Sequence, residues 1–186
     1  MKKIGRVFAF YNLGKIKVIA VMAFLSALSV VAGKFLAIPV GEYMRFSFEN
    51  LPILLSGIIF GPVCGMITGV VADLVGCIMA GYAINPFITA GAATIGLLSG
   101  LVYRTLPSGN RFLPLSATVV IAHFFGSVVV KTIGLSIYFG LPFKFTFMWR
   151  SLNYLIVGIA ELAVLYVLIN HSGFKKQISS VTGEKI

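Results

Sequence analysis

Long apolar stretches separated by short polar segments make up most of this 186-residue chain. A transmembrane helix needs about 20 predominantly apolar residues to cross the hydrocarbon core of a bilayer. The pattern predicts six such segments, at residues 16–38, 46–61, 63–80, 86–106, 112–139 and 147–169. The expected fold is an all-α integral membrane protein, a single membrane domain built as a compact bundle of six transmembrane helices.

The second of these segments is the least regular. Its continuous apolar run, Leu51–Phe60, has only ten residues and ends at Gly61-Pro62. It approaches a spanning length only if Phe46 and Phe48 belong to it, or if the helix is a shortened, tilted span. Before it, residues 39–50 (PVGEYMRFSFEN) combine proline, glycine, two acids and a base with several aromatic residues. This stretch is too long for a tight turn, and we expect a loop at the membrane surface.

Composition supports the membrane assignment. The chain is 59% hydrophobic and 11% charged, and its mean hydropathy is +1.01. Soluble domains carry about 25% charged residues. Six spans use roughly 120 residues, so we expect no separate catalytic domain. Cys64 and Cys77 lie inside one apolar stretch, and we interpret them as small packing residues.

Basic residues outnumber acidic residues by 15 to 5, giving a net charge of +10. In a soluble protein this excess would indicate nucleic acid, but here the cations flank apolar segments, which is typical of membrane topology. If both termini are cytoplasmic, most cations lie inside, as the positive-inside rule requires. The outer side then holds Lys34, Arg45, Lys144 and Arg150. We predict cytoplasmic N- and C-termini and no nucleic-acid partner.

Small residues recur at intervals of four along several segments. Gly61, Gly65 and Gly69 form one such series, and Gly96 and Gly100 form another. Small residues spaced in this way let helix backbones approach closely. Internal packing is the simplest interpretation for the glycines. Ala23 and Ala27, on an otherwise bulky first segment, are also candidates for contact with another protein.

Several ionisable residues lie at membrane depth, where charge is costly and therefore points to function. Asp73, Lys131 and Arg150 come from three different segments, and the predicted topology brings them to the outer half of the membrane together with Asn153. A structural ion pair of Asp73 with Lys131 or with Arg150 is one interpretation. Arg45 and other cations still leave an outer excess of positive charge. That excess suits an anionic ligand, preferably a carboxylate held by an arginine.

Aromatic residues also gather at the outer boundary: Tyr43, Phe46, Phe48, Tyr82, Phe143, Phe145, Phe147 and Trp149. One interpretation is an interfacial aromatic belt. The other is a pocket for a flat aromatic molecule, because rings for stacking lie close to the amides of Asn85 and Asn153 and to the outer cations.

Two further polar residues, His123 and Glu161, lie deeper in the predicted bundle. They are expected to pair with each other, or Glu161 faces a partner protein. No pattern predicts catalysis: the chain has no Gly-x-x-x-x-Gly-Lys-Ser/Thr loop and no His-Glu-x-x-His helix. Ser56 and Ser99 lack the glycine two positions earlier that an intramembrane serine protease would carry. We therefore expect no enzyme activity and no catalytic or metal-ligating residue.

Taken together, these motifs resemble the substrate-binding S components of energy-coupling factor (ECF) vitamin transporters. The resemblance covers roughly residues 16–170 and rests on Ala23-x-x-x-Ala27, Arg45-Phe-Ser-Phe-Glu-Asn-Leu-Pro-Ile53, Gly57-x-x-Phe-Gly-Pro62 and Gly69-x-x-x-Asp73-x-x-Gly76. With Asn85-Pro86 and Trp149-Arg150-x-x-Asn153, the chain looks most like the folate-specific member.

This resemblance implies a membrane protein of a prokaryote that captures a vitamin at the outer face of the cell membrane, under a gating loop at residues 39–50. It implies partners, namely a transmembrane T component and two ABC-type ATPases that use ATP and Mg, whereas this chain holds no cofactor. Ala23 and Ala27 correspond to the motif that contacts the T component. The loaded S component would then topple in the membrane to present its ligand inside.

For folate, the resemblance and the polar residues together give a specific site hypothesis. The pterin ring is expected among Trp149, Asn153, Asn85 and the loop aromatics, and the glutamate carboxylates near Arg45, Lys131 or Arg150. The full set of predicted ligand-binding residues is Arg45, Phe48, Asp73, Tyr82, Asn85, Lys131, Trp149, Arg150 and Asn153.

Two alternatives remain open from the sequence. The first is an S component for another substrate, such as riboflavin, thiamine or a queuosine precursor, although an outer cation excess disfavours cationic thiamine. The second is a non-transporting scaffold subunit of the membrane, in which Asp73, Lys131 and Arg150 form structural pairs only.

Overall fold

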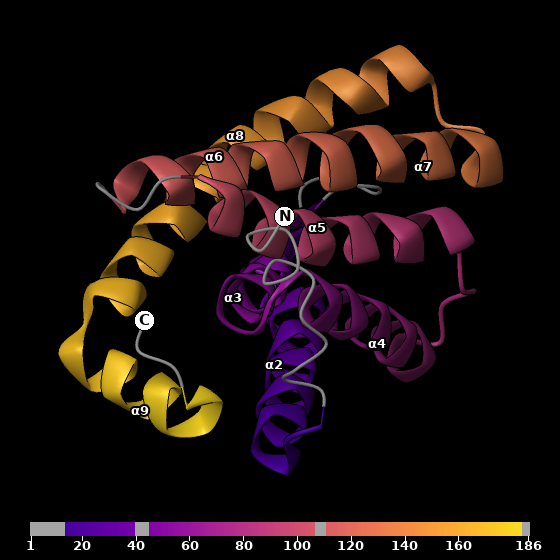
Figure 1. Cartoon of the computed structure of the whole chain (residues 1–186). Coiled ribbons are helices and arrows are strands. Elements are labelled where there is room, and N and C mark those ends of the chain that lie inside the picture. Colours follow the sequence, from indigo (N-terminus) through magenta and orange to yellow (C-terminus); the bar gives the residue numbers. More distant parts are fainter. Residues whose placement is uncertain (1–13, 40–44, 107–110, 184–186) are drawn as a thin grey trace.

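The computed structural model describes residues 14–39, 45–106 and 111–183, and nearly all of them are helical (Figure 1). In chain order the elements are α2 (Ile16–Lys34), β1 (Ile38–Pro39), β2 (Arg45–Phe46), α3 (Asn50–Phe60), α4 (Pro62–Ala80), α5 (Pro86–Thr105), α6 (Phe112–Ala122), the π-helix η2 (His123–Val130), α7 (Lys131–Phe139), α8 (Phe143–Asn170) and α9 (Ser172–Thr182). The predicted all-α class is confirmed.

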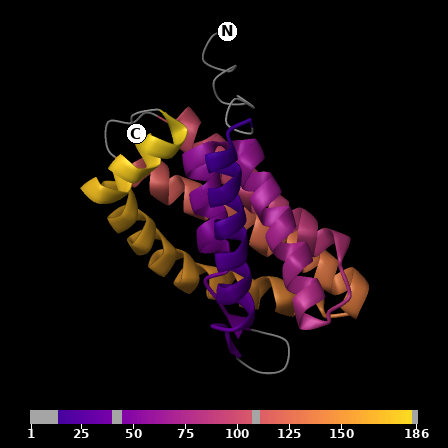
Figure 2. The ribbon, with the colours of Figure 1, turned by 90° about the horizontal axis from the view of Figure 1, so that it is seen from below.

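Five continuous helical segments are long and apolar enough to cross a membrane: α2, α4, α5, the run from Phe112 to Phe139, and α8. The last has 28 residues, about 42 Å at 1.5 Å per residue, which exceeds the roughly 30 Å hydrocarbon core. A helix of this length fits by tilting. Figure 2 shows α8 inclined strongly to α2.

The second predicted segment, 46–61, is helical only over α3, which has 11 residues. Residues Arg45–Phe46 instead form β2, whose partner strand is β1. Every residue of α3 except Leu51 is buried. A helix of about 16 Å is too short to span the hydrocarbon core, and α3 is an internal helix enclosed by its neighbours. Burial on all sides explains why its sequence is apolar without a polar face.

Other helix ends also differ from the sequence boundaries. The first helix stops at Lys34 rather than at residue 38, because Ile38–Pro39 form the β1–β2 ladder with Arg45–Phe46. The last long helix starts at Phe143 rather than at residue 147. It follows Gly140, whose φ of 63° ends α7 in the left-handed region that favours glycine.

Glycines bring α3, α4 and α5 into backbone contact. A Cβ atom on Gly65 would collide with the backbone of Gly96, and one on Gly96 would collide with the backbone of Gly65. A Cβ on Gly57 or Gly100 would likewise meet main-chain atoms of the facing helix. The interpretation of the spaced glycines as internal packing residues is therefore confirmed.

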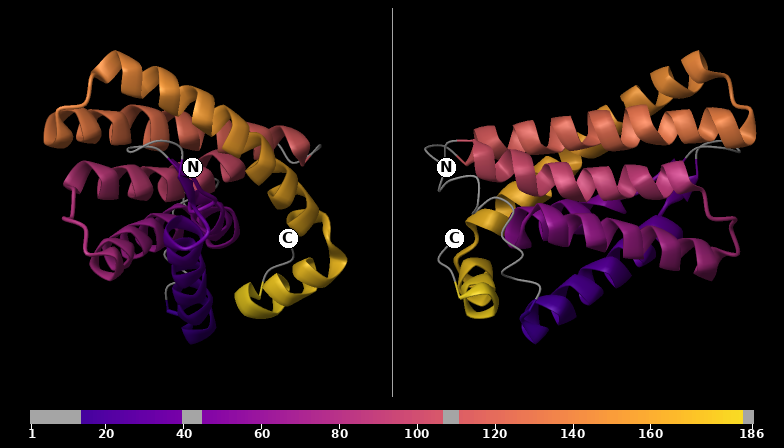
Figure 3. Two further views of the ribbon diagram at one scale, coloured as in Figure 1. Left: turned by 180° about the vertical axis from the view of Figure 1, so that it is seen from behind. Right: turned by 45° about the vertical axis from the view of Figure 1, so that its right-hand side comes forward.

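The described chain ends lie together. Figures 2 and 3 show the start of α2 and the end of α9 at one end of the molecule, which we call the terminal end. The opposite end, called the pocket end, carries the α4–α5 and α7–α8 connections. Phe174, Ile178 and Val181 of α9 pack against the core cluster that contains Val18. The Lys15 ammonium at the start of α2 donates to the carbonyl of Thr182 at the end of α9.

Candidate functional site

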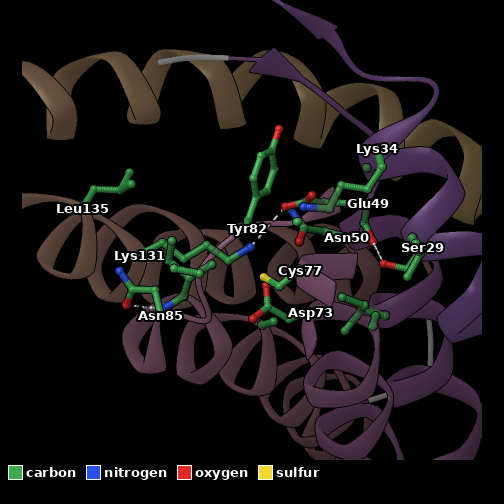
Figure 4. Close-up of a pocket in the computed structure, with 18 of the residues that line it drawn as sticks. Ser29, Lys34, Glu49, Asn50, Asp73, Cys77, Tyr82, Asn85, Lys131 and Leu135 are labelled. Atoms are coloured by element: carbon green, nitrogen blue, oxygen red, sulfur yellow. Dashed lines mark hydrogen bonds and ion pairs between the residues drawn. The ribbon is translucent and has the colours of Figure 1, made fainter. Parts of the chain in front are cut away.

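A cavity of about 370 Å³ opens at the pocket end, between α2, α3, α4, α5 and α7. Its floor is apolar, with Val30, Ile53 and Ala92 among the lining side chains. Polar and charged residues converge on it from every surrounding helix: Ser29, Lys34, Glu49, Asn50, Asp73, Tyr82, Asn85 and Lys131. Figure 4 shows how these side chains surround the cavity. An apolar cleft with a few convergent polar groups is the usual form of a small-molecule site.

Lys131 is the buried cation of this cavity. Only 4% of the residue is exposed, and its stem passes over Gly91, where a Cβ atom would collide with it. Its ammonium lies 3.2 Å from Oε1 of Glu49. Lys131 directly follows η2, and a π-helix accommodates extra residues per turn, so it changes the face on which later residues lie. The π segment therefore helps to set the direction from which Lys131 enters the cavity.

Glu49 anchors the start of α3 to two other elements. Its carbonyl accepts a 2.5 Å hydrogen bond from Ser29 Oγ on α2, and its carboxylate pairs with Lys131. The carboxylate occupies space that Gly33 leaves free, because a Cβ on Gly33 would come within 2.7 Å of Oε2. Glu49 is not among the ligand-binding residues predicted from the sequence. The signal available was an acidic residue directly before a fully apolar run.

Asp73 and Asn85 lie on adjacent walls of the cavity. Asp73 Oδ2 accepts a 2.6 Å hydrogen bond from Thr89 Oγ1. Asn85 caps α5, because its Oδ1 accepts from the backbone N–H groups of Phe87 and Ile88. Its Nδ2 donates to the carbonyl of Gly134 at 3.4 Å. The expected ion pair of Asp73 with Lys131 is not formed, since Lys131 pairs with Glu49 instead.

Lys34 and Tyr82 stand at the rim. The Lys34 ammonium lies 4.8 Å from the centre of the Tyr82 ring, a cation–π geometry. The Lys34 side chain packs against Gly76 of α4, where a Cβ atom would lie 3.1 Å from Lys34 Cε. With 58% of its surface exposed, Tyr82 presents an aromatic face at the mouth of the cavity. The described lining thus holds two cations, Lys34 and Lys131, and two acids, Glu49 and Asp73. Within this described lining, the cation excess expected from the sequence is absent.

Three predicted residues on α8 lie away from the cavity lining. Arg150 Nε donates to the carbonyl of Ser127 in η2 at 2.8 Å, and its guanidinium lies 5.2 Å from the Tyr154 ring centre. Trp149 Nε1 is buried and has no hydrogen-bond partner among the described residues. Asn153 is buried as well. Figures 1 and 3 show the reason: the continuous α6–η2–α7 helix runs between α8 and α5. An expected ion pair of Asp73 with Arg150 is not formed.

Two other predicted positions, Arg45 and Phe48, lie between α2 and α3. Phe48 is 44% exposed and does not line the cavity. Arg45 belongs to β2, but its side chain lies outside the part of the chain that is described, as do residues 40–44 of the predicted gating loop. The cavity therefore brings together Asp73, Tyr82, Asn85 and Lys131 from the predicted set.

The deeper polar pair is confirmed. His123 Nε2 lies 2.5 Å from Glu161 Oε2, and His123 Nδ1 lies 3.1 Å from Ser127 Oγ. Both residues are buried, and the His123 ring stacks on Tyr154 at 4.9 Å. This cluster joins η2 to α8 on the side of η2 that faces away from α5.

Comparison with known families decides the class of this protein. The family model described as "ECF-type riboflavin transporter, S component" matches residues 13–172. This chain belongs to the ECF-type S-component family. S components are the substrate-binding subunits of multi-pass membrane transporters and not enzymes, and they work with an ECF module.

Individual relatives agree with the family assignment. "Folate transporter FolT" of Clostridium novyi (strain NT) is 28% identical to this S component over 159 residues, which cover 82% of this chain and 87% of the relative. The crystal structure of FolT bound with folic acid superposes with a TM-score of 0.69 at 24% identity, covering 83% of this chain and 93% of that one. The S component for biotin gives a TM-score of 0.64 at 18% identity, with coverage of 89% and 97%. At these identities the two structures establish the fold of this S component.

Proposed function

We propose that this S component binds folate in the cavity at the pocket end and delivers it into a prokaryotic cell. The observation that carries the proposal is its similarity to a folate transporter along most of both chains. The termini would be cytoplasmic and the pocket end would face outward, in keeping with the predicted distribution of cations.

The chemistry of the cavity supports this proposal. Folate combines a flat heterocycle, which has N–H and carbonyl groups on its edge, with glutamate carboxylates at the other end. Tyr82 offers a ring face, and Asp73 offers an acceptor for ring N–H groups. Lys131 offers a buried cation for a carboxylate, and Arg45 at the edge of the outer loop is proposed for a second one.

The predicted residues on α8 are proposed to act at a distance. Arg150 holds the carbonyl of Ser127 within η2, the segment that directly precedes Lys131. Trp149 and Asn153 belong to the same helix as Arg150. Their role would be to fix the segment that carries Lys131 rather than to touch the vitamin.

Calorimetric titration of the purified S component tests the proposal. Folic acid is expected to bind tightly, and riboflavin and thiamine are expected to bind at least about a hundredfold more weakly, because buried polar groups left unpaired by a wrong ligand are costly. Binding of riboflavin but not folic acid would overturn the folate assignment. A protein that binds none of these vitamins would instead fit the scaffold alternative.

Riboflavin is the second candidate, because the matching family model carries a riboflavin transporter description. Riboflavin also has a flat ring with an N–H and carbonyl edge, but it lacks a carboxylate. The charge of the ligand therefore separates the two candidates. Arg45→Ala is expected to weaken folic acid about tenfold, the worth of one charge-assisted hydrogen bond, and to leave a pterin without glutamate unchanged. An equal loss for both ligands would remove Arg45 from carboxylate recognition.

The partner complex is proposed to dock on α2. Ala23 and Ala27 are both exposed on this helix, and small residues four apart permit close helix contact. The partners would be a T component and two ATPases that use ATP and Mg, and ATP hydrolysis there would drive toppling of the loaded S component. Ala23→Trp combined with Ala27→Trp should abolish vitamin uptake by cells and leave vitamin binding intact. Uptake at the wild-type rate in this double variant would rule out α2 as the docking face.

A further inference from the structure

Asn50 is a buried amide at the cavity without an internal partner. It is the first residue of α3 and lines the cavity, and its exposed fraction is 0%. Among the residues that the structure describes, neither its Oδ1 nor its Nδ2 has a hydrogen-bond partner. Figure 4 shows the Asn50 side chain pointing into the same part of the cavity as Glu49 and Lys131.

Neighbouring polar side chains in the same core are paired. Ser56 and Thr68, both buried, share a 2.7 Å hydrogen bond between α3 and α4. Asn85, the other asparagine of the cavity, uses both ends of its amide. A buried amide without partners destabilises the folded protein, because each group has lost its hydrogen bonds to water and gained none in return. Among the described residues that line the cavity, Asn50 is the one whose buried side-chain nitrogen and oxygen both lack a hydrogen-bond partner.

We propose that Asn50 determines which ring the S component accepts. Its Oδ1 accepts a hydrogen bond from a ring N–H, and its Nδ2 donates to the adjacent ring carbonyl. An asparagine amide presents one acceptor and two donors side by side, and it pairs in a bidentate manner with a heterocycle that has the complementary edge. The ligand class is thus a fused, planar heterocycle with an N–H next to a carbonyl.

Access to Asn50 requires a local rearrangement, since the side chain has no exposed surface. Glu49 is adjacent in sequence and is held by Lys131 across the cavity. Release of Glu49 from Lys131 is therefore the local change that would open the cavity toward Asn50.

This inference rests on the proposed function in that the vitamin occupies this cavity, and it is tested by pairing a change in the protein with a change in the ligand. The probes are folic acid and folic acid methylated on the ring nitrogen next to the carbonyl. The wild-type protein should prefer folic acid by about a hundredfold, as sites built to hydrogen-bond a ligand group reject analogues that lack it. In Asn50→Leu this preference should fall to nearly one. In Asn50→Asp, which accepts but does not donate, it should be intermediate.

Thr132→Val provides a matched control. Thr132 is also 0% exposed, and its Oγ1 has no hydrogen-bond partner in the described part of the chain, but it does not line the cavity. Both Asn50→Leu and Thr132→Val should raise the thermal unfolding temperature without ligand, because each removes an unsatisfied polar group. Only Asn50→Leu should remove ring discrimination.

The outcomes separate this inference from the folate proposal. If riboflavin binds and folic acid does not, the folate proposal fails, and the same comparison is made with riboflavin and 3-methylriboflavin. Undiminished ring discrimination in Asn50→Leu overturns the role of Asn50 with either vitamin, even if the wild type binds folate tightly. Failure of the wild type to bind either vitamin overturns both proposals.

Discussion

At the terminal end, α3, α4 and α5 meet backbone to backbone through glycines, whereas at the pocket end polar side chains lie between them. Gly57, Gly65 and Gly96 leave no room for a single methyl group. About two to three turns further toward the pocket end, Asn50 of α3, Asp73 of α4 and Asn85 at the start of α5 line a cavity of about 370 Å³. The glycine contacts hold these helices together in one half, which allows their other halves to leave space for a ligand.

The largest effect is expected from a methyl group added at the glycine contact. Gly96→Ala should lower the free energy of unfolding by about 3 kcal/mol or prevent folding, because overpacking in a tight core costs about 1–3 kcal/mol and here the colliding atoms are backbone. Gly158→Ala is the control, since a Cβ there finds its nearest neighbour at an ordinary 3.4 Å. Thermal unfolding in detergent measures both. Equal stability of the two variants would mean that backbone contact does not hold this half.

Removal of Lys131, the buried cation of the cavity, is expected to have the second-largest effect. Lys131→Met is expected to weaken folic acid about thirtyfold in calorimetric titration, because a charge-assisted hydrogen bond to the ligand is lost. This variant also leaves Glu49 without its Lys131 partner, so its stability should fall as well. Adding Glu49→Gln should restore stability but not affinity. Recovery of affinity in the double variant would show that Lys131 serves only to neutralise Glu49.

A smaller effect is expected at the helix cap on the cavity wall. Asn85→Ala should cost about 1 kcal/mol of unfolding free energy, the usual value of an N-cap side chain. Asn85→Asp should retain most of that stability, because the carboxylate still accepts from the N–H groups of Phe87 and Ile88. Chemical denaturation compares the two variants. Equal losses of unfolding free energy in Asn85→Ala and Asn85→Asp would show that the cap contributes little to stability.

The smallest effect concerns a buried hydrogen bond between α3 and α4. Ser56→Ala removes the 2.7 Å hydrogen bond to Thr68, and hydrogen bonds between membrane helices are worth about 0.6 kcal/mol on average. A double-mutant cycle with Thr68→Val should give a coupling energy near this value. A coupling above about 2 kcal/mol would place the main link between α3 and α4 here and not at the glycines.

Much of the fold was predictable because hydropathy and small-residue spacing act locally. Apolar runs located the long helices, the four-residue glycine spacing identified the close packing at Gly65 and Gly96, and the depth of His123 and Glu161 indicated their pairing. Length alone did not reveal that α3 is internal, because a ten-residue apolar run has the same composition whether lipid or protein surrounds it.

The site was less predictable, because depth in the membrane does not fix direction around a helix axis. Arg150 and Asn153 lie at a depth compatible with Asp73, but they belong to a helix separated from the cavity by α6–η2–α7. Lys131 lines the cavity, but its pairing with Glu49 was not predicted. The π-helix before Lys131 has no simple sequence signature. Glu49, which pairs with Lys131, lies directly before α3, and hydropathy does not predict the position of that part of the chain.

The contact between the end of α9 and the start of α2 has a consequence for biosynthesis. Lys15 and Thr182 are separated by 167 residues, so α2 gains its contact with α9 only after α9 has been translated. Contacts between such distant parts of a chain form late. Until then, the start of α2 lacks its hydrogen bond to Thr182, and termination of translation before α9 would release an inserted protein in which this contact never forms.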